Sequence, residues 1–106
     1  MTAPEDLVLN YRVALLRYLP RREEEALTAG YEIGRSAVTR QVTILELAQV
    51  HHDVHLGILE ETADEDRLGV AAAASEFFLE VLATFDMAQR ALPGGDAAQP
   101  RTDGAA

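Results

Sequence analysis

Apolar residues recur every three to four positions along most of this chain, and that spacing is typical of amphipathic helices. The helices we predict span residues 4–19, 22–40, 44–60 and 66–92. Pro20 ends the first helix, and a short turn separates the third from the fourth. Ala, Leu, Glu and Arg dominate these segments, and all four are good helix formers. The pattern predicts an all-α fold, a four-helix up-down bundle.

Local signals support the helix boundaries. Thr2 with Glu5, and Thr43 with Glu46, have the spacing of a capping box at a helix start. Gly30 and Gly34 inside the second helix each cost about 1 kcal/mol relative to Ala, so we expect another helix to approach closely there. Residues 1–92 are predicted to form one helical domain. Residues 93–106, which begin Pro-Gly-Gly, are predicted to be a disordered tail or linker.

Two of the predicted helices carry apolar residues on two faces. In the first, one face holds Leu7, Tyr11, Ala14, Leu15 and Tyr18, and a narrower stripe holds Leu9, Val13 and Leu16. In the fourth, one stripe holds Leu68, Ala71, Ser75, Phe78, Leu79, Leu82 and Phe85, and another holds Phe77, Val81, Thr84 and Ala88. We expect the first stripe named for each helix to face the core.

A domain of about 90 residues buries only somewhat over ~60% of its unfolded surface, so it has little room to hide both faces of both helices. Because exposed apolar stripes mark interfaces, the sequence predicts a homodimer. The expected interface consists of Leu9, Val13, Leu16, Phe77, Val81 and Ala88. Another interpretation stays open, in which one of the second stripes is simply core in an irregular bundle.

Composition narrows the function classes. The formal net charge of -9 argues against nucleic acid and against an anionic membrane surface as partners. No run approaches the ~18 uncharged apolar residues of a membrane-spanning helix, and the acidic start is unlike a secretory signal, so we expect a cytoplasmic protein. The chain has no Cys, which excludes disulfides and thiolate metal sites.

Catalytic motifs are missing from the sequence. Ser36 and Ser75 are its only serines, and neither lies in a G-x-S-x-G turn. There is no Gly-rich phosphate-binding loop. We therefore expect a non-catalytic protein without a cofactor. The acidic run Glu23–Glu25 has two compatible interpretations: favourable charge near a helix start, or an acidic recognition surface.

The three histidines, His51, His52 and His55, all fall in the third predicted helix. His51 and His55 are one turn apart, so they can bind a metal together with a carboxylate such as Asp86. Alternatively they are neutral, hydrogen-bonded histidines of the interior or of a pH-sensitive interface. The H-E-x-x-H signature of zinc proteases does not fit, because His52 follows His51. A small metal- or ligand-sensing bundle that uses His51 and His55 is the alternative function.

A family resemblance joins these features. It is carried by Tyr11, Leu15–Leu16 and Tyr18, then Leu27, Ala37–Val38, I-L-E-L-A-Q-V-H from Ile44 to His51, Phe78–Val81 and Met87–Ala88. Over about residues 7–90 the chain resembles the N-terminal domain of RsbU-type serine phosphatases. The resemblance implies an all-helical dimer that binds a switch kinase of the RsbT type. That binding activates a PPM-type phosphatase domain, in cis or in trans, which dephosphorylates an anti-anti-sigma factor and so releases a stress sigma factor.

The resemblance also implies where the kinase binds: on the second helix and the later part of the fourth. The matching positions are Glu24, Thr28 and Ala83; Glu24 fits the family pattern, whereas Thr28 and Ala83 are smaller than the residues expected there. Because a binding hot spot usually needs a large anchor, we expect Tyr31, Ile33 or Met87 to supply it. The predicted partner-binding set is Glu24, Thr28, Tyr31, Ala83 and Met87. A bare dimerisation domain without a further partner is a third hypothesis.

Overall fold

The structure is a computed structural model that describes residues 4–91, and it is all-α over that range. Its helices are α1 (Glu5–Tyr18), α2 (Glu24–Thr39), α3 (Ile44–Glu60) and α4 (Arg67–Ala91), with a short 3-10 turn η1 (Asp64–Asp66) before α4. The predicted helices agree with these bounds to within two residues at every end. Thr2 and the predicted tail at 93–106 lie outside the described residues.

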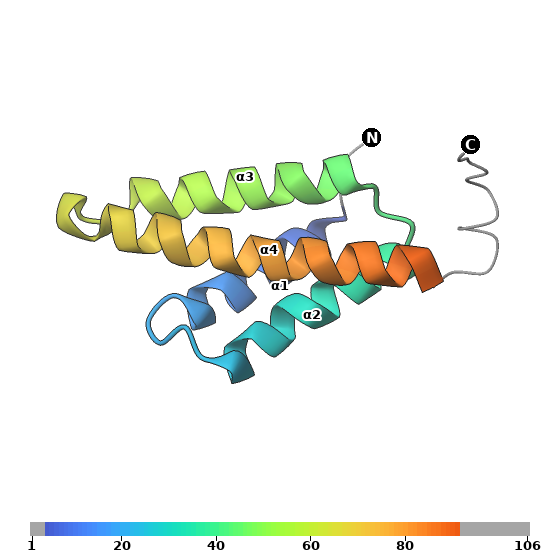
Figure 1. Ribbon diagram of the computed structural model, residues 1–106. Helices are drawn as coiled ribbons and strands as arrows, with labels where there is room; N and C mark the ends of the chain where they lie inside the picture. The colour runs from blue at the N-terminus through green and yellow to red at the C-terminus, as the bar shows by residue number, and fades with distance from the viewer. Residues whose placement is uncertain (1–3, 92–106) are drawn as a thin grey trace, which may run out of the picture.

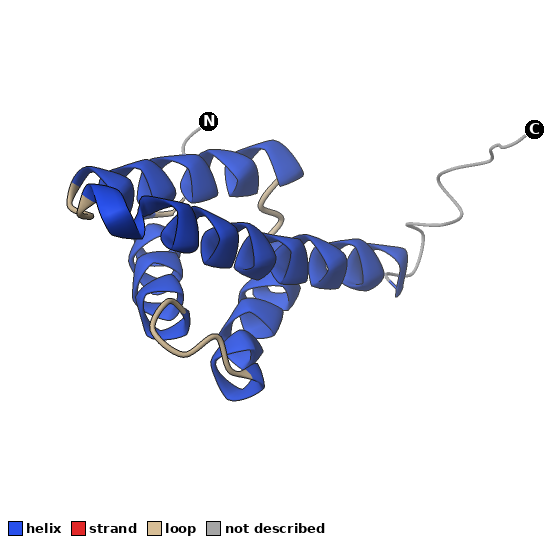
Figure 2. Ribbon diagram, turned by 60° about the vertical axis from the view of Figure 1, so that its left-hand side comes forward, coloured by secondary structure: helices blue, strands red, loops and turns tan. Residues whose placement is uncertain are grey.

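The four helices are arranged as two pairs. Helices α3 and α4 lie side by side and run in opposite directions, joined by η1 (Figure 1). Helices α1 and α2 lie on one side of this pair and run across it (Figure 2). The most extensive contact between elements is that of α2 with α4. The other side of the α3–α4 pair is not covered by any described helix.

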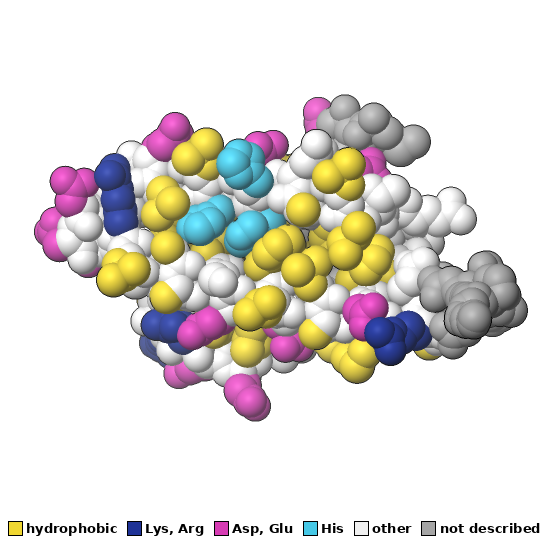
Figure 3. Space-filling model, turned by 45° about the horizontal axis from the view of Figure 1, so that its top comes forward, with side chains coloured by type: hydrophobic (Ala, Val, Ile, Leu, Met, Phe, Trp, Pro, Cys, Tyr) yellow, Lys and Arg dark blue, Asp and Glu magenta, His cyan; other side chains and the backbone are white. Residues whose placement is uncertain are grey.

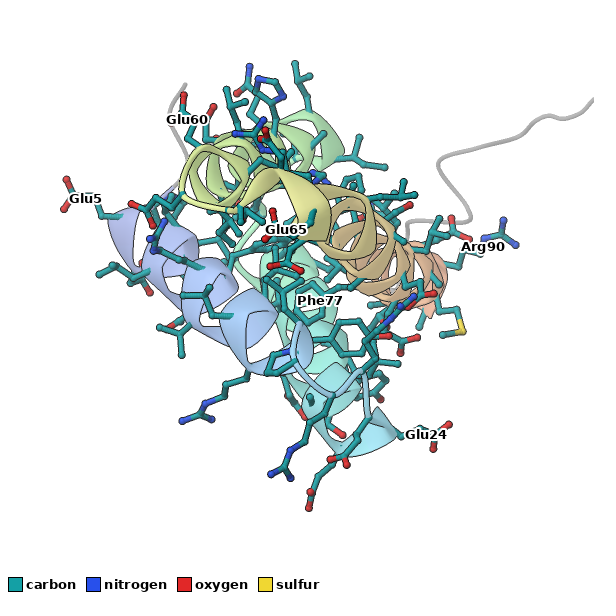
Figure 4. All side chains as sticks on the ribbon, turned by 90° about the vertical axis from the view of Figure 1, so that its left-hand side faces the viewer. Glu5, Glu24, Glu60, Glu65, Phe77 and Arg90 are labelled. Carbon is teal, nitrogen blue, oxygen red and sulfur yellow. The ribbon has the colours of Figure 1, made fainter. Side chains whose placement is uncertain are left out.

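The core lies where the two pairs meet. Its largest fully buried side chains are Tyr11, Leu15, Leu47, Phe77 and Val81. Phe77 points between the helices, with its ring edge-on to Tyr11 at 5.4 Å between centroids, whereas Glu5, Glu24 and Arg90 point outward (Figure 4). The whole predicted core face of α1 is buried, from Leu7 to Tyr18. The prediction for α1 is therefore confirmed.

Over most of their length the two stripes of α4 have the opposite arrangement from the one predicted, although Phe85 of the stripe assigned to the core is buried as expected. Phe77, Val81 and Thr84, assigned to an outer stripe, are fully buried within one chain. In the stripe assigned to the core, Leu68 is 83% exposed and Leu79 is 63% exposed. That part of the sequence interpretation is wrong, because helical periodicity identifies apolar faces but does not rank two of them.

Glycines in α2 explain why the Phe77 side of α4 is the buried one. A Cβ on Gly34 would lie 2.6 Å from the carbonyl oxygen of Val81, and one on Gly30 would lie 3.2 Å from the Phe77 ring. The two helix backbones thus approach more closely than any larger residue at position 34 allows. The close approach expected from the two glycines is confirmed. Because Gly30 meets Phe77 and Gly34 meets Val81, the two helices run in the same direction at their contact.

Polar contacts fix the helix ends. Thr43 and Glu46 form the predicted capping box: the Thr43 N–H donates to Glu46 Oε1 at 2.9 Å, and the Glu46 N–H donates to Thr43 Oγ1 at 3.1 Å. After α1, Arg22 adopts a left-handed conformation (φ 55°), and its guanidinium donates from Nε to Glu76 of α4 at 3.0 Å. The Tyr18 hydroxyl donates to the same carboxylate oxygen at 3.0 Å. These bonds fasten the α1–α2 turn to α4.

Helix α4 together with η1, residues 64–91, is long and apolar enough to cross a membrane by length and composition alone. In this fold the same segment carries the charged Glu76 and Glu80 and packs its Phe77 side into the core. A core helix passes the same test of length and composition. The segment therefore serves here as the central packing helix of the domain.

Candidate docking groove

Four of the five predicted partner-binding residues line a groove between α2 and α4, and the fifth, Ala83, lies one turn before Met87 on α4. Glu24, Thr28 and Tyr31 lie at one-turn spacing along α2, and Ala83 and Met87 lie one turn apart on α4. All five are exposed, and Met87 is 60% exposed. We call this surface the α2–α4 groove. Residues that are separated by about 50 positions in sequence thus form one continuous surface.

The groove has two hollows that meet at Tyr31. The one near the start of α2 is acidic and is lined by Glu24, Leu27, Thr28, Tyr31 and Glu80. The other, farther along both helices, combines polar and apolar side chains and is lined by Tyr31, Arg35, Val38, Thr39, Thr84, Met87, Ala88 and Ala91. Its α4 side is apolar apart from Thr84, and we call it the apolar hollow. A carboxylate from each helix thus lines the first hollow, and a methionine with small residues lines the second.

Tyr31 is positioned by Arg35, one turn along α2. The Arg35 guanidinium carbon lies 5.7 Å from the centroid of the Tyr31 ring, and its Nη1 donates to the Tyr31 hydroxyl at 3.4 Å. Tyr31 remains 37% exposed, so its ring presents both an apolar side and a polar tip to the groove. Close by, the buried Thr84 hydroxyl that lines the apolar hollow has no hydrogen-bond partner among residues 4–91.

Sequence reasoning misplaced one anchor and overlooked two lining residues. Ile33 is only 7% exposed and belongs to the core, so it does not supply an anchor for a partner. Glu80 and Arg35 were not singled out, although they complete the two hollows. Both lie one helical turn from predicted positions, Ala83 and Tyr31, and that spacing is the signal that points to them.

The residues of the predicted dimer interface fall into three groups by exposure. Leu9, Val13 and Leu16 are exposed on α1, at 62%, 51% and 43%. Phe77 and Val81 have no exposed surface and therefore cannot contact a second copy, so that part of the prediction is wrong. Ala88 is half-buried and lines the apolar hollow of the α2–α4 groove.

The histidines form a cluster on α3 over α4, apart from the groove. The His51 ring stacks on Phe78 with 4.0 Å between centroids, and its Nδ1 shares a hydrogen bond of 2.8 Å with the Tyr11 hydroxyl. Burial, with a smaller contribution from neighbouring His55, lowers the pKa of His51 to about 4. Burial also lowers the pKa of His55, whose Nε2 is buried and has no hydrogen-bond partner within the described part of the chain. At neutral pH these rings are uncharged.

The metal interpretation requires a further ligand beside His51 and His55. Within residues 4–91 no group of three or more His, Cys, Asp or Glu side chains is placed to hold a metal ion. Asp86, the carboxylate proposed for that role, forms an ion pair with Arg90 at 3.2 Å. The geometry instead matches the other interpretation, in which the histidines are neutral and partly interior.

Comparison with protein families gives a match over most of the chain. The family model described as phosphoserine phosphatase RsbU, N-terminal domain, matches residues 9–88 of the 106-residue chain. This range includes both sides of the α2–α4 groove and the histidine cluster. No curated protein and no solved structure matches the chain.

Proposed function

Because this chain belongs to the family of RsbU N-terminal domains, we propose that it binds an RsbT-like switch kinase through the α2–α4 groove and acts as a homodimer. Domains of this family are regulatory parts of RsbU-type phosphatases in stress partner switching, and the phosphatase activity resides in a separate domain. The proposed role is to couple kinase binding to a PPM-type phosphatase domain, in cis or in trans, in the cytoplasm.

One observation carries the proposal: the five residues expected to contact a partner are all exposed, and four of them, Glu24, Thr28, Tyr31 and Met87, line the two hollows of one groove. A core role would have buried at least some of them. The groove also has the mixed character of a binding hot spot, since a half-exposed aromatic ring lies beside an exposed methionine and a polar rim surrounds both.

The chemistry of the groove defines what a partner must offer. Glu24 and Glu80 place two carboxylates at the acidic hollow, and the molecule carries a formal net charge of -9. We expect the kinase to present an arginine or lysine there, which also speeds encounter by electrostatic steering. Beside that cation it must present an apolar side chain that fills the hollow next to Met87.

The test is a binding measurement between the purified protein and the RsbT-class kinase encoded in the same genome. Glu24→Lys reverses one charge of the acidic hollow and is expected to weaken binding at least about tenfold. Glu60→Lys makes the same change in charge at the far end of α3, where the side chain points away from the groove (Figure 4). This control is expected to bind as the unaltered chain does.

A second pair of variants tests the apolar hollow. Met87→Ala removes the exposed methionine and is expected to weaken binding about tenfold, whereas Leu68→Ala, on the side of α4 away from the groove, is expected to leave it unchanged. If the kinase does not bind, or binds all four variants alike, docking at this groove is excluded. A dimer that binds no kinase would instead support the bare dimerisation domain.

A further inference from the structure

The α2–α4 groove carries opposite charges at its two hollows. The acidic hollow has a carboxylate from each helix, Glu24 and Glu80, whereas the apolar hollow has the guanidinium of Arg35. Tyr31 lies between these charges, because it lines both hollows. Eleven positions separate Glu24 from Arg35 along α2, which corresponds to about 16 Å at 1.5 Å per residue. The groove is therefore long enough to distinguish one end of a bound segment from the other.

Arg35 is free to bind an anion from a partner. Its guanidinium forms no ion pair within residues 4–91, although the chain has 18 acidic residues. Glu32, one turn earlier on α2, lines a different hollow, between α1 and α2. The Arg35 guanidinium lies over the Tyr31 ring instead. A guanidinium that rests on a ring uses its flat face, and the N–H donors along its edge stay available to a carboxylate.

A second exposed apolar area has no comparable pattern of charge. Figure 3 shows hydrophobic side chains gathered around the three histidines of α3, with acidic and basic side chains at the margins. Charges at the margins do not distinguish one occupant from another. In the α2–α4 groove the charged side chains line the hollows themselves, so charge complementarity defines what fits there.

The groove lies between two helices, and this setting favours a helix as its occupant. An extended segment typically binds by adding to the edge of a sheet, and residues 4–91 form no strand. An amphipathic helix instead places its apolar side in a groove. Positions i, i+4, i+7 and i+11 of such a helix share one side, and the first and last are about 16 Å apart. That spacing matches the one from Glu24 to Arg35.

We propose that the α2–α4 groove binds an amphipathic helix of the kinase that carries a basic residue toward one end and an acidic residue about three turns away. The basic residue pairs with Glu24 and Glu80, the acidic residue accepts hydrogen bonds from Arg35, and the apolar residues pack against Tyr31 and Met87. Turning the helix end for end would bring like charges together at both hollows, so the groove accepts it in one direction. This inference rests on the proposed docking function and adds an anion-binding position to it.

Variants of Arg35 test the anion-binding position. Arg35→Glu is expected to weaken binding of the RsbT-class kinase from the same genome at least about tenfold, with helicity unchanged. Arg67→Glu makes the same change at the exposed start of α4, away from both hollows, and is expected to bind as the unaltered chain does. Arg35→Lys, which keeps the charge, should bind more tightly than Arg35→Gln. Equal losses in the Lys and Gln variants would assign Arg35 to positioning Tyr31 alone and would overturn the inference.

A charge swap on the kinase identifies the acidic residue. Each exposed Asp or Glu on the helices of the kinase is changed singly to Arg, and its binding is measured to the unaltered chain and to Arg35→Glu. One kinase variant is expected to bind the unaltered chain at least about tenfold more weakly and to regain most of that loss with Arg35→Glu. If no kinase variant regains binding with Arg35→Glu, the anion-binding position is excluded.

The results separate this inference from the docking function on which it rests. Weaker binding of Glu24→Lys and Met87→Ala, together with unchanged binding of Arg35→Glu, supports docking at the groove and overturns the anion-binding position. A kinase that does not bind the unaltered chain overturns both.

Discussion

Two faces of α4 are built from the same kinds of residue but have different surroundings. The face with Phe77, Val81 and Thr84 is buried against α1 and α2. The opposite face, which carries Leu68, Ser75 and Leu79 and which we call the Ser75 face, is exposed. Hydrophobicity does not separate them, because both carry large apolar side chains at helical spacing. What separates them is the shape of the neighbouring helix, since Gly34 lets the α2 backbone approach the first face. Burial is decided by fit as much as by polarity.

The largest expected effect comes from truncating the buried face. Phe77→Ala removes a fully buried ring that contacts both Tyr11 and Tyr18, and it should lower the free energy of unfolding by about 3–5 kcal/mol. Leu79→Ala on the Ser75 face should change the stability of a single chain by no more than about 0.5 kcal/mol. Denaturant titrations at several protein concentrations separate this intrinsic effect from any loss of dimer. Equal losses at the two positions would contradict the assignment of faces.

The second-largest effect on stability is expected at the close approach of α2 to α4, which buries the Phe77 face. In Gly34→Ala the new methyl group would lie 2.6 Å from the Val81 carbonyl oxygen and 2.9 Å from the Thr84 Cβ, so the backbones of α2 and α4 must separate. We expect a net loss of about 2 kcal/mol in unfolding free energy, even though Ala is the better helix former. Thermal unfolding measures the change, and a variant as stable as the unaltered chain would show that the approach is not required.

A smaller effect on the free energy of unfolding is expected when the pH is lowered, because the histidines of α3 become protonated. The groups packed on His51 are Tyr11 from α1, Phe78 from α4 and His55 from α3, and none supplies a negative charge at neutral pH. Because the pKa of His51 is about 4 in the folded chain and 6.5 ordinarily, the unfolded chain takes up the proton first as pH falls. Stability is therefore full above pH 6.5 and is lost as pH falls from 6.5 toward 4.

Allowing for the partial exposure of the ring, the loss should be about 1–2 kcal/mol. Bonding to Arg22 lowers the pKa of Glu76 below its ordinary 4.5, so that carboxylate contributes to the pH dependence only at lower pH. The interval from pH 6.5 to 4.5 therefore reports on the histidines. Chemical unfolding across this interval should give a falling curve for the unaltered chain and a flatter one for His51→Gln. A loss that is just as steep in the variant would assign it to other groups.

The smallest effect on stability is expected at Gly69, which differs from Gly34 in having room for a side chain. Gly69 lies near the start of α4, and no atom of the described residues that could obstruct a Cβ lies within 4 Å of the position that it would occupy. Gly69→Ala should therefore raise the unfolding free energy by about 0.5–1 kcal/mol through helix propensity alone. The same substitution thus has opposite signs at positions 69 and 34. A destabilised Gly69→Ala variant would indicate a contact on that side of α4.

The candidate site was predictable to the extent that it depends on helix register. Glu24, Thr28 and Tyr31 lie on the exposed side of α2, and Ala83 and Met87 lie on the exposed side of α4. The family resemblance implies Glu24, Thr28 and Ala83, and the need for a large anchor points to Tyr31 and Met87. The groove itself was not predictable. Glu80 and Arg35 line it only because α2 and α4 lie at a particular position along each other's length, and the sequence does not specify that position. Ile33 illustrates the limit, since it lies two positions from Tyr31 but points into the core.

The sequence alone determined the elements of this protein: four helices with their boundaries, the capping box at Thr43, the buried face of α1, and the need for close approach at Gly30 and Gly34. These follow from local energetics and from the helical period, which act within a single segment. Only the tertiary structure decided which apolar face of α4 is buried in the core and which apolar face stays exposed on the surface. That choice depends on how the surfaces of separate helices fit together, and the pattern of any one helix does not contain this information.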